Sequence, residues 1–145
     1  MTRLAAMLLA AVACARPGLA NAAESVEYLY RLKCSGCHGM AGAGSSIGRI
    51  PPFTGIIGHF AESHDGRLYL VRVPGVANAG LPDAETADIL NYVMLHWGGD
   101  GSPRPPPEFT TEEVATLRAI HLDDIAALRR KLAASLSRHG ISTDY

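Results

Sequence analysis

Residues 34–38 read Cys-Ser-Gly-Cys-His, and this short run determines how the rest of the chain is interpreted. On a turn of helix the thiols of Cys34 and Cys37 face the same side, because residues three apart are neighbours on a helix surface. His38 follows at once, so its imidazole is carried beside the two thiols. A single turn therefore offers two covalent attachment points and one nitrogen ligand to a bound group.

This Cys-x-x-Cys-His pattern is the attachment signature of c-type haem. Each thiol adds to one vinyl group of the haem, and the histidine becomes the proximal axial ligand of the iron. The pattern therefore predicts one haem c per chain, held through Cys34 and Cys37 and ligated by His38. A zinc site would need a second cysteine pair, which the chain lacks. A thioredoxin-like pair expects a βαβ setting, and a plain disulfide would leave His38 unexplained.

The composition is that of a small globular protein. The chain has 145 residues, of which 48% are hydrophobic and 19% charged, and this length suits one domain with room for an appendage. The 13 Lys and Arg residues against 14 Asp and Glu give a formal net charge of −1. We therefore expect no large basic surface for nucleic acid.

The first 22 residues have the three parts of a secretory signal peptide. Arg3 gives a positive start, residues 4–13 form an unbroken apolar run of ten, and small residues follow. Such a run spans only about 15 Å as a helix, half the core of a bilayer, so we expect no transmembrane span. Cleavage near residue 22 would export the protein to the periplasm or beyond. Retention of Cys14 as a lipid anchor is the less favoured alternative, because Ala11 stands where lipoprotein signals usually have leucine.

The rest of the chain predicts an all-α fold. The clearest helix covers residues 82–97. It starts with a proline and acids at 82–85, continues with apolar residues at helical spacing, and is followed by glycines after Trp97. Thr110 and Glu113 match the Ser/Thr-x-x-Glu capping box. The expected helices cover residues 24–33, 67–73, 82–97, 110–119 and 122–138. Between the first two, residues 39–58 form a glycine-rich loop of a length that normally wraps something.

These elements divide the chain into four parts. Residues 1–22 are the signal peptide, residues 23–100 a haem domain, and residues 101–109 a stiff, proline-rich linker. Residues 110–145 form a helical C-terminal extension of two helices. The extension packs its apolar stripe on the haem domain, or else docks a redox partner or a second copy. A chain that lacks residues 103–145 is expected to keep a folded, haem-loaded core.

The chain between residues 24 and 99 resembles a class I c-type cytochrome. The similarity rests on the short helix that ends in CSGCHG, the loop with IPPF, the segment LYLVRVPG and the helix LPDAETADILNYVMLHW. It implies that residues 23–100 are a cytochrome c domain whose first and last helices cross and clamp one haem. It also implies an electron-transfer protein rather than an enzyme, with the carbonyl of Pro51 or Pro52 accepting the N–H of the proximal histidine.

The chain departs from that family at the second axial position of the iron. The family places a methionine about seven residues before the acid that opens its last core helix, and here that position falls at Val76, which cannot bind iron. Asn78, whose amide oxygen is a weak ligand, lies in the same loop. Asn78 or an open site is therefore the first choice for the distal position, although an asparagine in a loop more commonly forms a turn.

The other candidate ligands rank lower. His59 and His64 come next, although histidines in loops are mostly solvated, and Met94 on the last core helix comes last. Met40 follows His38 too closely to reach the opposite face of the haem. The remaining histidines are expected at helix ends or on the surface: His96, His121 and His139.

Two functions follow from these expectations. The first is single-electron transfer, as a carrier or as a subunit for a periplasmic redox protein or dehydrogenase. The second is binding or sensing of a small gas ligand, because a methionine ligand stabilises ferrous iron and raises the potential, and its absence leaves a weakly ligated or open site. Electron transfer is favoured by analogy, since the fold serves it more often.

Overall fold

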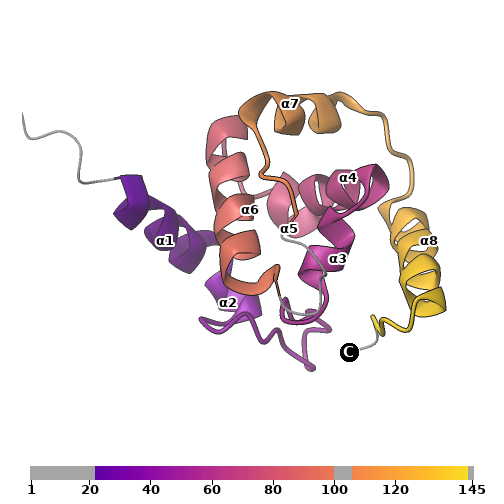
Figure 1. Ribbon diagram of the computed structural model, residues 1–145. Helices are drawn as coiled ribbons and strands as arrows, with labels where there is room; N and C mark the ends of the chain where they lie inside the picture. The colour runs from indigo at the N-terminus through magenta and orange to yellow at the C-terminus, as the bar shows by residue number, and fades with distance from the viewer. Residues whose placement is uncertain (1–21, 100–105, 144–145) are drawn as a thin grey trace, which may run out of the picture.

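The computed structural model describes residues 22–99 and 106–143, and within them it contains eight α-helices (Figure 1). These are α1 (Ala22–Lys33), α2 (Ser35–His38), α3 (Ile57–Ala61), α4 (His64–Arg72), α5 (Pro74–Ala77), α6 (Asp83–Trp97), α7 (Thr111–Ala119) and α8 (Ile125–Arg138). An isolated bridge between Ser45 and Ile50 is the one strand-like pairing of the described residues. The predicted all-α fold is confirmed. None of these helices is long and apolar enough to cross a membrane.

Each of the four predicted parts of the chain includes residues outside the described ones, which are residues 1–21, 100–105 and 144–145. Residues 1–21 of the signal peptide and residues 101–105 of the linker lie outside the described residues. The end of the linker, residues 106–109, is described and packs on the helices, as shown below.

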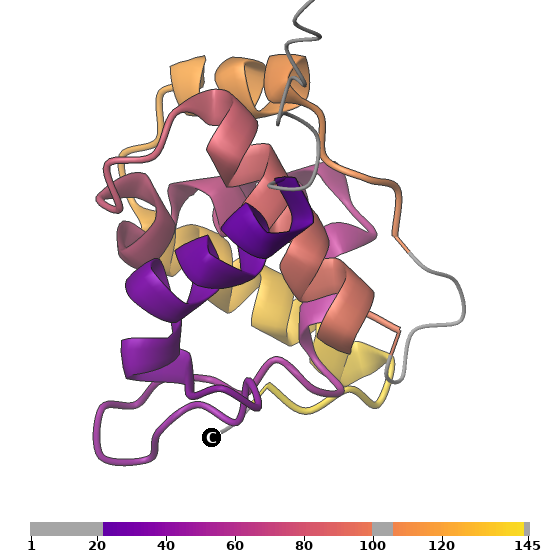
Figure 2. The ribbon, with the colours of Figure 1, turned by 90° about the vertical axis from the view of Figure 1, so that its left-hand side faces the viewer.

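Helices α1 and α6 cross and form one side of the core, as the resemblance implied (Figure 2). Tyr30 on α1 is fully buried. Its ring lies 5.4 Å from that of Tyr92 and 5.3 Å from that of Trp97, both on α6. Tilted aromatic pairs at this spacing stabilise a contact beyond the area they bury. The crossing therefore rests on aromatic side chains at the end of α1 that leads into α2.

Helix α4 begins three residues earlier than its spacing predicted. The Ser63 side chain accepts a hydrogen bond from the backbone N–H of Gly66 at 3.1 Å and caps the helix. Val73 ends it in an extended conformation, because a residue before proline avoids the helical region. Pro74, expected only to stop the helix, also starts the short helix α5, since proline is favoured in a first turn.

Helix α3 was not predicted, because the loop was expected to extend to residue 58. All five of its residues are buried. Gly58 allows the backbone of α3 to approach the end of α6 so closely that a Cβ there would lie 1.9 Å from the carbonyl oxygen of Gly98. This close approach joins residues far apart in the chain, so no local signal predicted the contact.

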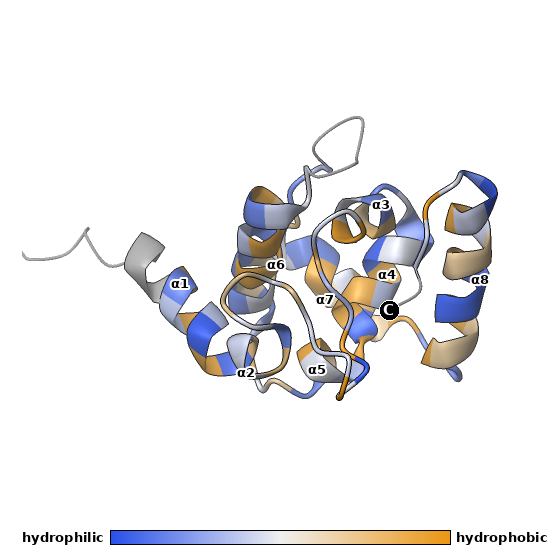
Figure 3. Ribbon diagram, turned by 90° about the horizontal axis from the view of Figure 1, so that it is seen from below, coloured by the Kyte–Doolittle hydropathy of each residue, from blue (hydrophilic) through white to orange (hydrophobic). Residues whose placement is uncertain are grey.

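The last described part of the chain, from Phe109 onward, shares one core with residues 22–99. Helix α7 packs on α4 and α6, and α8 packs on α4 at the opposite end of the molecule from α1 (Figures 1 and 3). Four buried apolar residues from this part of the chain belong to the same cluster as the side chains of α1, α3, α4 and α6: Phe109, Val114, Leu117 and Leu132. The extension therefore packs on the haem domain, the first of the predicted alternatives.

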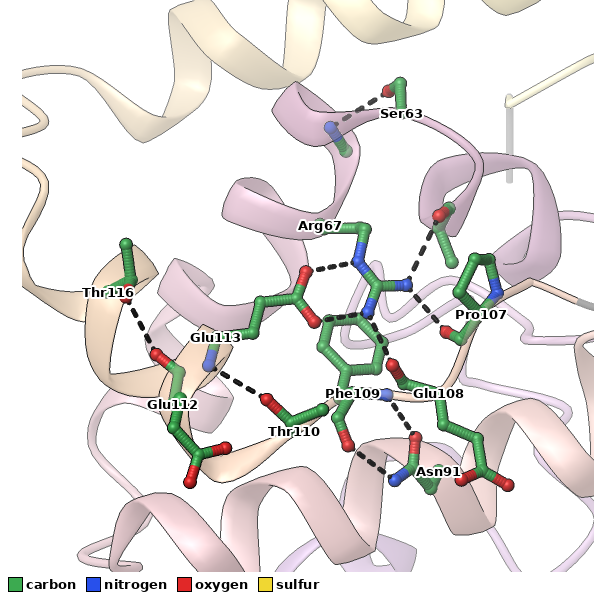
Figure 4. Close-up of polar contacts among 12 residues, drawn as sticks. Ser63, Arg67, Asn91, Pro107, Glu108, Phe109, Thr110, Glu112, Glu113 and Thr116 are labelled. Atoms are coloured by element: carbon green, nitrogen blue, oxygen red, sulfur yellow. Dashed lines mark hydrogen bonds and ion pairs between the residues drawn. The ribbon is translucent and has the colours of Figure 1, made fainter.

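Arg67 of α4 fastens the start of the extension (Figure 4). Its guanidinium group donates two hydrogen bonds of 2.5 Å to the carboxylate of Glu113. It also donates to the carbonyl oxygens of Pro107 at 2.8 Å and Glu108 at 3.1 Å, and lies 3.7 Å from the centre of the Phe109 ring. These contacts hold the end of the predicted linker against the core.

Candidate functional site

In the CSGCH run, Cys34 is the residue that precedes helix α2, and the helix itself carries Cys37 and His38. The backbone N–H groups of Cys37 and His38 donate to the carbonyl oxygen of Cys34, at 3.2 and 3.0 Å, and close a helical turn. Both thiols are free, with Cys34 half-buried and Cys37 exposed. Burial, and then the neighbouring Cys37, raises the pKa of the Cys34 thiol to about 11. The thiol of Cys34 is therefore protonated at neutral pH.

His38 is oriented by a backbone carbonyl group and by an aromatic ring. Its Nδ1 atom lies 3.2 Å from the carbonyl oxygen of Pro51, and its ring stacks on Phe53 with 4.1 Å between centroids. Burial lowers the pKa of His38, while the hydrogen bond to Pro51 acts in the opposite direction. A carbonyl oxygen only accepts, so in the neutral ring Nδ1 carries the proton and Nε2 keeps its lone pair for a metal. Of the two prolines named for this contact, Pro51 makes it.

The loop after α2 folds back to hold these side chains in place. The N–H of Gly44 donates to the carbonyl oxygen of His38 at 2.9 Å, and the N–H of Phe53 donates to that of Gly42 at 2.8 Å. Gly42 has a φ of 64°, and a Cβ there would lie 2.8 Å from the Trp97 ring. Only glycine meets both demands, the left-handed backbone and the close approach.

Aromatic side chains form a wall behind His38 that the sequence analysis missed. Phe53 lies 5.4 Å from Trp97, and Trp97 lies 5.3 Å from Tyr30, by ring centroids. The hydroxyl of Tyr30 donates to the carbonyl oxygen of Gly39 at 2.6 Å, and burial is the main cause that raises the pKa of Tyr30 to about 12. Two features of the sequence could have predicted this wall: a tyrosine four residues before Cys34, and a tryptophan at the end of the last core helix.

The segment 73–82 contains the residues considered for the distal position. Val76 lies half-buried on α5, and Asn78 follows that helix and is exposed. The backbone N–H of Asn78 donates to the carbonyl oxygen of Pro74 at 3.0 Å, so the residue also closes a turn. Lys33 donates to the carbonyl oxygen of Ala79 at 3.0 Å, which ties the segment to α1 directly before the CSGCH run.

The lower-ranked ligands lie in different surroundings. His59 was expected in a solvated loop, and this was wrong: it is buried on α3, and its Nδ1 lies 3.1 Å from Glu62. The packing of α3 against the end of α6 accounts for the difference. His64 is 71% exposed, Met94 is buried in the core, and Met40 is 54% exposed.

The last three histidines lie where the sequence placed them, on the surface. All three are exposed: His96, His121 and His139. His96 and His139 each direct Nδ1 at a carbonyl oxygen of their own helix, and His121 lies 2.7 Å from Asp123. These contacts are ordinary for histidines at helix ends.

The donor set of α2 fits a covalently attached haem. Thioether formation needs two free thiols on one side of a turn, and Cys34 and Cys37 provide them. An axial ligand needs a neutral imidazole with one nitrogen fixed and the other available, which the contact between His38 and Pro51 provides. The aromatic wall adds apolar surroundings for a flat, apolar group.

Comparisons with known proteins agree with this fit. No protein-family model and no solved structure matches the chain. Two proteins from Thermus thermophilus, both named cytochrome c-552, are similar in sequence. One is 33% identical over 135 residues, covering 79% of this chain and 90% of the relative, and the other is 32% identical over 120 residues, covering 69% and 91%. On this similarity the chain belongs to the c-type cytochromes, electron-transfer proteins that carry covalently bound haem c, with one haem at this size.

Proposed function

We propose that the protein is an exported monohaem c-type cytochrome that passes single electrons to or from a periplasmic redox protein or dehydrogenase. The observation that carries the proposal is the turn of α2, which presents two free thiols beside an imidazole anchored to Pro51. Cys34 and Cys37 would hold the haem through thioether bonds, and His38 would be the proximal ligand. The bound haem supplies an iron that alternates between the ferrous and ferric states.

The chain's own residues would tune that centre. The carbonyl group of Pro51 fixes the ring of His38 and increases the basicity of Nε2, as a hydrogen-bonded partner does for a metal-bound histidine. Phe53, Trp97 and Tyr30 would make the surroundings of the bound group beside His38 apolar, and an apolar shell controls solvent access and hence the potential. These residues therefore set how readily the centre gains or loses an electron.

The partner would meet the loop that follows α2. Met40 is 54% exposed and Ile47 is 98% exposed on this loop, next in the chain to the exposed Cys37. Large apolar side chains at such exposure suit a transient contact with another protein. The division into a cytochrome c domain of residues 23–100 and an extension of residues 110–145 remains part of this proposal.

Mass spectrometry of the purified protein tests attachment and export together. We expect a chain shortened by about 22 residues and heavier by one haem, with the haem resisting extraction into acidified organic solvent. The variant Cys37→Ser should keep one thioether bond and shift the absorption band of the reduced pyridine complex. A haem that leaves the wild-type protein on extraction, or an intact N-terminus on the periplasmic protein, would contradict the proposal.

A second function is binding or sensing of a small gas ligand, and the segment 73–82 favours it. The segment holds no methionine, histidine or cysteine, and its one amide side chain, that of Asn78, is exposed. A weak or open distal position admits an outside ligand. Rapid, saturable binding of CO by the ferrous protein would support this function, and refusal of CO would show a strong sixth ligand from the chain.

A further inference from the structure

Helix α7 holds the segment 73–82 at both of its ends. At the start, the guanidinium group of Arg72 donates to the carbonyl oxygens of Arg118 at 2.6 Å and Ile120 at 2.8 Å. At the finish, the guanidinium group of Arg118 donates to the carbonyl oxygen of Leu81 at 3.1 Å. Arg118 therefore contacts the chain at both ends of the segment. Its backbone carbonyl group binds Arg72, which directly precedes the segment, and its side chain binds Leu81 near the segment's end.

The side chain of Arg118 also holds the start of α6. It forms an ion pair with Asp83, the first residue of that helix, and donates to the hydroxyl of Thr86 at 2.8 Å. Thr86 is fully buried, and 27% of the Arg118 side chain is exposed. Loss of the guanidinium group would leave a buried hydroxyl and a carbonyl group without their donor, which is costlier than loss of a surface contact.

The middle of the segment is fixed beside the attachment turn. Lys33 donates to the carbonyl oxygen of Ala79, and Lys33 directly precedes Cys34. Three contacts thus fix the segment that carries Val76 and Asn78. Lys33 of α1 binds its middle, and Arg118 of α7 contacts the chain at each of its two ends. Two of the three depend on the C-terminal extension.

We propose that Arg118 is a positioning residue for the distal side of the haem. It fixes the segment 73–82, and in doing so it determines how closely Val76 and Asn78 approach the iron and how readily an outside ligand enters. The inference rests on the proposed function in one respect, that this segment faces the iron opposite His38. It gives the extension a role in the haem site that packing alone would not require.

The test compares three variants of the full-length holoprotein. Arg118→Gln removes the charge and the fork of donors, whereas Arg118→Lys keeps the charge near Asp83 but cannot bind Leu81 and Thr86 in the same way. Glu113→Gln is the matched control, because it weakens the attachment of α7 through Arg67 and touches neither end of the segment. Three measurements are made on each: backbone amide exchange by peptide, midpoint potential, and CO association with the ferrous form.

We expect Arg118→Gln to raise amide exchange in the segment 73–82 several-fold more than in α8, and to shift the potential and speed CO association. Arg118→Lys should lie between it and the wild type, and should remain informative if the glutamine variant fails to fold. Glu113→Gln should lower stability while both haem measurements stay at the wild-type values. This pattern separates positioning of the segment from general support of the fold.

Two results would overturn the inference. Equal effects of Arg118→Gln and Glu113→Gln on every measurement would reduce Arg118 to general support of the fold. Faster exchange in the segment with an unchanged potential and CO rate would show that the segment does not face the iron. A wild-type ferrous protein that refuses CO overturns only the weak distal ligand of the proposed function, and exchange and potential still decide the role of Arg118.

Discussion

His38 is held by contacts that come from one short stretch of chain. The Pro51 carbonyl group fixes Nδ1, and the Phe53 ring covers one face of the imidazole. The turn of the CSGCH run and the nearby proline pair could both be predicted, because they depend on residues close in sequence. The stacking of Phe53 on His38 could not, because it depends on where the loop returns and on the position of Trp97.

Replacement of Phe53 by alanine should destabilise the protein and alter the haem. The ring is buried between His38 and Trp97, and deletion of a buried phenylalanine ring costs about 3 kcal/mol of the free energy of unfolding. Denaturant unfolding of the holoprotein measures this loss. Phe53→Leu keeps most of the apolar volume and serves as the control, with a smaller loss. Equal stability of Phe53→Ala and the wild type would show that the ring is not part of the core.

The variant Val76→Met should supply a strong sixth ligand to the iron and so remove the weak or open distal position that we propose. The sequence resemblance implies that residue 76 occupies the methionine position of class I cytochromes, and Val76 is half-buried on α5. If the segment faces the iron, Val76→Met raises the midpoint potential by on the order of 0.1 V, a fraction of the roughly 0.8 V over which axial ligands tune haem proteins. The same variant should bind CO more slowly. An unchanged potential and CO rate would place the side chain of residue 76 away from the iron.

At the scale of elements, helices with local sequence signals were predicted, whereas the short helices α3 and α5 were missed. The capping hydrogen bond from the Glu113 N–H to the Thr110 side chain, at 3.1 Å, starts α7 as the capping box predicted. Helix α4 begins earlier than predicted because the side chain of Ser63 caps it. Helices α3 and α5 have five and four residues, too few for a periodic pattern. His59 was misplaced for the same reason, since its burial depends on contacts distant in sequence.

The approach of α3 to the end of α6 should tolerate no side chain at residue 58. A Cβ on Gly58 would lie 1.9 Å from the carbonyl oxygen of Gly98, so both backbones must move. We expect Gly58→Ala to lower the free energy of unfolding by about 3 kcal/mol or more. The control is Gly75→Ala on α5, where a Cβ meets nothing within 4 Å and alanine favours the helix by up to about 1 kcal/mol. Thermal unfolding with equal midpoints for the two variants would contradict this account.

At the scale of the whole molecule, the extension is more closely joined to the core than the sequence suggested. The deletion of residues 103–145 was expected to leave a folded, haem-loaded core. The deletion should lower the free energy of unfolding, because it removes four residues of the shared cluster: Phe109, Val114, Leu117 and Leu132. The turn of the CSGCH run could be predicted from its local motif. The contacts that join the extension to the core could not, because Arg67 pairs with Glu113 and Arg118 with Asp83 across long sequence separations that leave no local signal.

We therefore expect the deletion to destabilise the holoprotein severely. Each buried leucine or phenylalanine lost from a core costs about 2 kcal/mol or more, and each kcal/mol lowers the thermal midpoint of a domain this size by roughly 4 °C. Thermal unfolding followed by the haem absorption measures the fall, with the full-length holoprotein as control. A truncated protein with the same midpoint as the full chain would show that the extension adds nothing to the core.

The ion pair between Arg67 and Glu113 should make stability depend on pH. The Arg67 guanidinium group, and then a backbone hydrogen bond from Thr110, lower the pKa of the Glu113 carboxyl group in the folded protein. Its contribution is therefore complete above the usual glutamate pKa of about 4.3 and is lost as the pH falls through the lowered value. We expect about 1 kcal/mol at neutral pH, because Glu113 is partly exposed.

Denaturant unfolding of the wild type and Glu113→Gln across a pH series measures this contribution. The difference between them should be constant from neutral pH down to about 5 and should shrink below about 4.3. A difference that stays constant into the acid range would show that the carboxylate charge does not stabilise the fold.

The sequence separations of these contacts also bear on how the chain matures. The hydrogen bond from Tyr30 to Gly39 closes a stretch of nine residues beside the attachment turn. The bonds from Arg67 to Glu113 and from Lys131 to Asp65 span 46 and 66 residues. Short loops close before long ones, because long loops lose more chain entropy and form slowly. The turn that bears the thiols therefore needs only short-range contacts to take shape, whereas the docking of α7 and α8 needs contacts between residues far apart in the chain.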